Sequence, residues 1–197
     1  METTFLCLFD LQPYDLTVAP ALREYTLRYD PRAVVSLLQE VKELLPVLRQ
    51  DRSRPLLTEE DYEHWMVSIA PDAGYKPSAE TIRELSAMLV QPLCVPRGTA
   101  FPPMLDLGPA KDWLAARSEW FADLLEGGEE LAGGRLEFSF GSNNRVATRQ
   151  QITQFLEEVR SVESAVGDAA RHLLMLLEAA DANGHYTLLM TRLGSAS

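Results

Sequence analysis

The stretch that decides the fold runs from Arg149 to Ala182 and reads RQQITQFLEEVRSVESAVGDAARHLLMLLEAADA. Its apolar residues recur alternately every three and four positions: Ile152, Phe155, Val159, Val162, Val166, Ala169, Leu173, Leu176 and Ala180. This spacing places them along one side of an α-helix. We therefore predict a long helix at 149–182, either a single helix of about 45 Å or two collinear pieces that bend near Gly167.

The flanking residues indicate how this helix packs. Leu156, Ala170, Leu174 and Leu177 make the apolar stripe wider than the seam of a two-stranded coiled coil, and flanking opposite charges are sparse. The pattern favours a core helix that lies on a sheet. Homodimerisation through the same helix is the alternative, so the chain is expected to be a monomer or a homodimer.

Four segments have the patterns of strands. Residues 3–9 are almost entirely apolar or β-branched, as in a strand covered on both faces. Residues 23–29 and 135–140 alternate between apolar and polar side chains, which is typical of a half-buried strand. Residues 185–193 follow Asn183-Gly184, which ends the long helix, and are predicted as the last strand.

Helices are expected between these strands. Asp30-Pro31 and Thr58 supply helix starts, Pro46 should kink or end the first of these helices near Leu45, and further helices are expected at 78–89 and 110–125. The order of elements predicts an α+β fold with about four mostly antiparallel strands and helices on one face. We expect a single domain over 1–197 with an irregular segment at 92–109, which contains five prolines.

Composition limits the class of protein. The chain has 197 residues, of which 46% are hydrophobic and 24% charged, values that exclude a wholly disordered protein. Its 29 acidic and 18 basic side chains leave a net charge of −11, which disfavours nucleic acid as a partner. No signal peptide or membrane span is predicted, and two cysteines form no disulfide framework. We expect a cytoplasmic protein. The sequence does not decide whether Cys7 and Cys94 form a disulfide.

Motifs for enzyme chemistry are missing. The sequence contains no phosphate-binding glycine loop, no nucleophile elbow and no zinc-ligand spacing. His64 follows Glu60 and Asp61, and His172 follows Asp168 by one helical turn, but each pair is interpreted first as a solvated or helix-flank pair. The function of both histidines stays open. We predict no catalytic residue, no metal and no cofactor.

One weak small-ligand site is predicted at 141–149. This segment joins a strand to a helix start, at which Thr148 and Gln151 are predicted to form a capping box. Free backbone N–H groups and two arginines there could hold an anion. The residues concerned are Ser142, Arg145, Thr148 and Arg149. A turn with solvated arginines is the favoured interpretation of the same segment.

Acidic side chains are concentrated in two places. The first group comprises Glu59, Glu60, Asp61 and Glu63, and the second includes Asp123, Glu126, Glu129 and Glu130. Such groups usually keep a surface solvated, but they can also form a docking face for a basic protein. The apolar side chains of 92–109 could likewise meet a partner, although packing over the core is the favoured interpretation.

These observations predict a non-enzymatic acidic protein-binding module that docks a basic partner. A bacterial immunity protein, an inhibitor and a chaperone-like protein share this composition, so the comparison is one of gross properties only. The alternative is an enzyme or binder of small anions that uses the site at 141–149.

Overall fold

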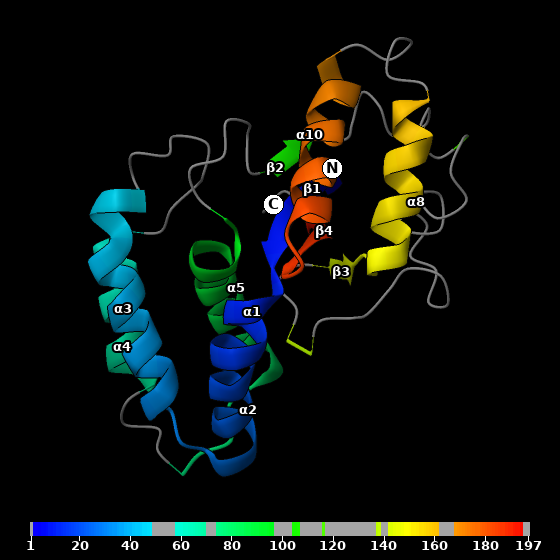
Figure 1. Ribbon diagram of the computed structural model, residues 1–197. Coiled ribbons are helices and arrows are strands. Elements are labelled where there is room, and N and C mark those ends of the chain that lie inside the picture. The colour runs from blue at the N-terminus through cyan, green and yellow to red at the C-terminus, as the bar shows by residue number, and fades with distance from the viewer. Residues whose placement is uncertain are drawn as a thin grey trace. The chain divides into compact units, whose positions relative to one another are not determined.

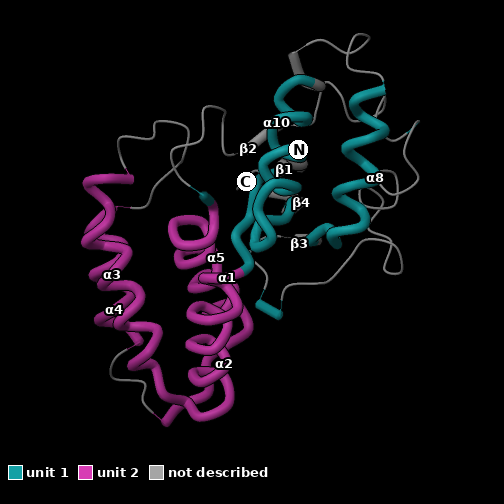
Figure 2. The backbone as a smooth tube through the Cα atoms, in the orientation of Figure 1, with its two compact units in different colours: residues 1–11, 96–197 teal, residues 12–95 magenta. Residues whose placement is uncertain are grey.

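The computed structural model describes residues 2–48, 58–69, 74–96, 104–106, 116, 137–138, 142–161 and 168–194. The chain divides into two compact units, one formed by 1–11 with 96–197 and the other by 12–95 (Figure 2). The second unit is therefore an insertion within the first in the order of the chain. Folding of 1–197 as one domain stays a prediction.

The inserted unit is helical. It contains the π-helix η1 (Tyr14–Val18) and the helices α2 (Ala19–Arg28), α3 (Arg32–Leu48), α4 (Glu59–Ile69) and α5 (Ala79–Cys94), preceded by the short α1 (Leu11–Pro13) (Figure 1). α3 packs against α2, α4 and α5. Its buried side chains are Val34, Leu37, Leu38, Val41, Leu45 and Leu48. Burial of this stripe makes α3 the central element of the unit.

Local capping explains where these helices begin. The carboxylate of Asp30 accepts a hydrogen bond of 3.1 Å from the backbone N–H of Arg32, and Thr58 forms a reciprocal cap with Asp61. The predicted starts at Asp30 and Thr58 are confirmed.

The two internal prolines do not end their helices, because α3 continues through Pro46 to Leu48 and α5 through Pro92 to Cys94.

The predicted strand at 23–29 is wrong, because these residues continue a helix to Arg28. The alternation of Tyr25, Leu27 and Tyr29 is misleading: Leu27 is 70% exposed, whereas Tyr25 is buried. Burial instead follows Val18, Ala21, Leu22 and Tyr25, a helical spacing that continues from the residues before 23. Tyr29 ends α2 in the left-handed conformation with φ of 58°.

The described residues of the other unit form a small sheet and two helices. β1 (Glu2–Asp10) pairs with β4 (Tyr186–Gly194) over nine residues, and the short strands β2 (Met104–Asp106) and β3 (Ser142–Val146) flank them in the antiparallel order β2-β1-β4-β3. Cys7, Leu8 and Phe9 are all at most 1% exposed. Since successive strand residues point to opposite faces, both faces of β1 are covered there.

The predicted long helix at 149–182 is also wrong. It consists of α8 (Arg149–Arg160) and α10 (Asp168–Ala182), which pack against each other as well as against β4. Arg149 at the start of α8 donates hydrogen bonds to Ala180 and Asp181 at the end of α10. In a continuous helix these residues would be about 48 Å apart. The members of the apolar stripe whose burial is described are all buried: Ile152, Phe155, Val159, Leu173, Leu176 and Ala180.

The predicted fold class, an α+β domain with about four strands, is therefore corrected. Helices make up most of the described elements, and the only extended ladder among them is the antiparallel pair β1–β4. Of the predicted strand at 135–140, the structure describes Glu137 and Phe138, which form a bend. The first and last predicted strands correspond to β1 and β4.

The segment 92–109 is less irregular than predicted, because its first three residues end α5 and Met104–Asp106 form β2. Within the described ranges, Cys7 and Cys94 are buried thiols that are not joined in a disulfide. None of the helices described has the length and hydrophobicity needed to cross a bilayer.

Candidate docking surface

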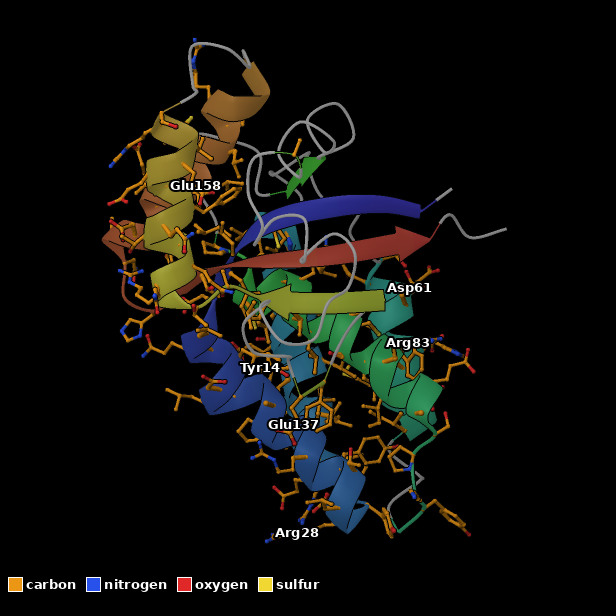
Figure 3. All side chains as sticks on the ribbon, turned by 90° about the vertical axis from the view of Figure 1, so that its right-hand side faces the viewer. Tyr14, Arg28, Asp61, Arg83, Glu137 and Glu158 are labelled. Atoms are coloured by element: carbon orange, nitrogen blue, oxygen red, sulfur yellow. The ribbon has the colours of Figure 1, made fainter. Side chains whose placement is uncertain are left out.

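The first predicted acidic group lies at the start of α4, where the sequence also supplies the helix cap. The hydroxyl of Thr58 accepts from the backbone N–H of Asp61 at 3.2 Å. In return, the Asp61 carboxylate accepts from the backbone N–H and the hydroxyl of Thr58 at 2.7 and 2.8 Å. These hydrogen bonds lower the pKa of Asp61. Asp61 is therefore occupied in holding the helix start (labelled in Figure 3).

Glu63 connects this group to the neighbouring helix. Its carboxylate accepts a hydrogen bond of 2.5 Å from the ammonium group of Lys42 on α3. The Glu63 side chain is 57% exposed and that of Lys42 is 23% exposed, so the pair lies at the surface. Exposed pairs of this kind contribute little to stability.

Lys42 is surrounded by carboxylates from both helices. The hydrogen bond that Lys42 donates to Glu63 raises the pKa of Lys42 most, and the charges of Glu63, Glu59 and Glu43 raise it further. Glu43, Glu59 and Glu60 are exposed. Among the described residues, Lys42 therefore lies within a field of several carboxylates, and these side chains together carry a net negative charge. We call Lys42 with Glu43, Glu59, Glu60 and Glu63 the α3–α4 acidic surface.

Sequence reasoning found the α4 residues but missed Lys42 and Glu43. Their contribution depends on the packing of α3 against α4, which no local pattern records. A weaker signal was present, since elements that follow each other in the chain are usually adjacent in space. The second predicted acidic group, Asp123, Glu126, Glu129 and Glu130, lies outside the described residues.

The arrangement of residues 141–149 differs from that of the predicted anion site. Thr148 caps α8 in a reciprocal arrangement with Gln151, which confirms the predicted capping box. The guanidinium group of Arg149 donates to the carbonyl oxygens of Ala180, Asp181 and Asn183. Two of the four expected ligand groups are thus engaged, Thr148 in capping α8 and Arg149 in holding α8 to the end of α10. Ser142 and Arg145 lie on β3, and their side chains are outside the described set.

The three histidines have separate surroundings. His64 is exposed on α4, His172 is partly buried on α10, and His185 is exposed immediately before β4. The side chain of Asp168, the expected partner of His172, is not among those described. Over the described parts of the chain, no group of three or more His, Cys, Asp or Glu side chains is placed to hold a metal ion.

Comparison of the chain with protein-family models, curated proteins and solved structures finds no match. The case for a function therefore depends on the residues and contacts described above.

Proposed function

We propose that this chain is a non-enzymatic protein-binding module that docks a basic partner protein on the α3–α4 acidic surface. An inhibitor, an immunity protein or a chaperone-like protein would act in this way. The observation that carries the proposal is the surplus of carboxylates around Lys42, which come from two helices packed side by side. Such a field attracts a positively charged partner and orients it during the encounter.

The composition supports the same function. A net charge of −11 acts over the whole molecule, and the α3–α4 acidic surface gives a local point of contact. Glu60 adds a further exposed carboxylate that, within the described part of the chain, has no ion-pair partner. A partner that supplies Lys or Arg side chains would neutralise these groups with little rearrangement of α3 and α4.

The alternative function, binding or conversion of a small anion at 141–149, is not retained. Arg149 would have to leave the carbonyl oxygens at the end of α10 before it could bind a ligand. The hydroxyl of Thr148 would likewise have to leave its cap.

The test is affinity capture from the source cells, followed by identification of the bound protein and measurement of its affinity. We expect a basic protein whose affinity falls as ionic strength rises, because salt screens exposed charges. The variant Glu59→Gln/Glu60→Gln/Glu63→Gln should weaken binding by about tenfold or more.

A matched control removes the same number of charges elsewhere. Glu80 and Glu84 on α5 and Glu157 on α8 are exposed, so Glu80→Gln/Glu84→Gln/Glu157→Gln should change the affinity by less than about threefold. Capture of no protein, or equal losses in the two triple variants, would contradict docking at this surface.

A further inference from the structure

The helices of the inserted unit are anchored to very different degrees. Of the 11 residues of α4, Tyr62 and Ile69 are buried. In contrast, α3 buries six of its 17 residues, α5 seven of 16 and α2 four of 10. Since burial of apolar side chains is the main force that holds a helix in place, α4 is the least firmly held of the four.

Among the described residues, one buried side-chain hydrogen bond joins the first half of α4 to α5. The hydroxyl of Tyr62 donates to the backbone carbonyl oxygen of Met88 on α5 at 3.2 Å, and both residues are buried. Met88 lies four residues before Pro92, which has no N–H group to donate to this carbonyl. Tyr62 therefore supplies the hydrogen bond that Pro92 removes from α5.

A second contact lies at the surface. The bridge between Lys42 and Glu63 joins α4 to α3, but both groups can be solvated when they separate. The carbonyl of Met88 lies in a buried region, so loss of its donor is more costly. Of these two contacts, the Tyr62–Met88 hydrogen bond is therefore the one whose loss opposes separation of α4 more strongly.

We propose that α4 is a strap that opens as a unit while α2, α3 and α5 stay folded, and that the Tyr62–Met88 hydrogen bond is its latch. Opening separates Glu63 from Lys42 and uncovers the face of α3 that α4 covers. This inference does not rest on the proposed function, because it is argued from the burial of α4 and from the Tyr62–Met88 hydrogen bond, whatever binds the acidic surface.

The test is native-state hydrogen exchange of the full chain, with the exchange rate of each amide monitored by NMR. In the unmodified protein, the helical amides of α4 should be protected at least about tenfold less than the slowest amides of α3 and α5. Equal protection in the three helices would overturn the proposal.

Two tyrosine variants separate opening of α4 from global unfolding. Tyr62→Phe should raise the opening constant of α4 about tenfold, because the variant lacks the hydrogen bond that stabilises the closed position of α4. Tyr25 is buried on α2, so Tyr25→Phe should leave α4 exchange unchanged even where it destabilises the whole unit. If Tyr25→Phe raised α4 exchange as much as α3 exchange, α4 would open only by global unfolding and the proposal would fail.

A third variant tests the chemical basis of the latch. Pro92→Ala provides an N–H group for the Met88 carbonyl, so Tyr62→Phe in that background should raise α4 opening by less than about threefold. An undiminished tenfold effect would show that Met88 is not the partner that matters. If Tyr62→Phe does not fold, exchange in the unmodified protein and in Tyr25→Phe decides the question.

Discussion

At the scale of single residues, Arg149 makes an unusual contribution to the unit formed by 1–11 and 96–197, which we call the sheet unit. Its guanidinium group donates to three carbonyl oxygens at and just beyond the end of α10, where the helix has no further backbone donors. The positive charge also lies at the negative end of that helix dipole. One side chain therefore joins the first residue of α8 to the last turn of α10.

Replacement of this arginine should be costly. We expect Arg149→Met to lower the free energy of unfolding by about 1–3 kcal/mol, measured by urea denaturation. Arg160→Met is the matched control, because Arg160 lies on the same helix and its ion pair within the described residues is an exposed one of 2.9 Å with Glu178. That variant should lose less than about 1 kcal/mol. Equal losses would remove the special role of Arg149.

Asp30 provides a prediction about pH. Hydrogen bonds from the Arg32 side chain and backbone lower the pKa of Asp30 from 3.8 to about 2. Because the folded-state pKa is the lower one, this contact stabilises the fold fully above pH 3.8 and the contribution is lost as pH falls towards 2. Arg32→Gln should return the pKa towards 3.8, as followed by NMR titration of the carboxylate. An unchanged titration would argue against the Arg32 contacts.

At the scale of elements, the two internal prolines differ in their surroundings. Pro46 lies inside α3 and leaves the carbonyl of Lys42 without a helical donor, just as Pro92 does for Met88. The carbonyl of Met88 is bonded to Tyr62, and Pro46 is exposed. The same amino acid should therefore have different energetic effects in the two helices.

Pro46→Ala adds a backbone hydrogen bond to α3, and we expect it to stabilise the protein by about 1 kcal/mol in urea denaturation. Pro92→Ala should stabilise it less, because the carbonyl that gains a donor already has one. A larger gain from Pro92→Ala than from Pro46→Ala would contradict this account of the two helices.

Short-range signals in the sequence predict helix starts well. Asp30, Thr58 and the pair Thr148 and Gln151 cap their helices as expected, since a cap involves residues only two or three positions apart. Periodicity performs less well. The alternation at 23–29 is short enough to occur by chance within a helix, and the stripe at 149–182 does not record that the chain turns back on itself.

The candidate site follows the same rule. The α4 carboxylates are evident in the sequence, whereas Lys42 and Glu43 join them only through packing of two helices. Arg149 was predicted as an anion ligand because two arginines follow a turn. Its true contacts are 31 to 34 residues away along the chain, beyond the reach of any local motif.

At the scale of the whole molecule, one unit is inserted into the other in the order of the chain. The helical unit is continuous, from 12 to 95, whereas the other unit needs both ends of the chain. β1 supplies the strand between β2 and β4, so the sheet is incomplete without the first residues. A sequence pattern does not show this insertion, because the strands that pair lie on either side of it.

This organisation predicts the behaviour of fragments. A fragment of residues 12–95 should fold alone and give a helical circular dichroism spectrum with a cooperative thermal transition. A fragment of 96–197 should not, because it lacks β1. An unfolded 12–95 fragment, or a cooperatively folded 96–197 fragment, would show that the two units depend on each other differently.

The most direct test of the central claim is an amide footprint of the complex with the captured basic protein. Hydrogen exchange should slow at the start of α4, around Glu59, Glu60 and Glu63, and around Lys42 and Glu43 on α3. The footprint should weaken at high ionic strength. A footprint confined to the sheet unit, with α3 and α4 unchanged, would contradict docking on the α3–α4 acidic surface.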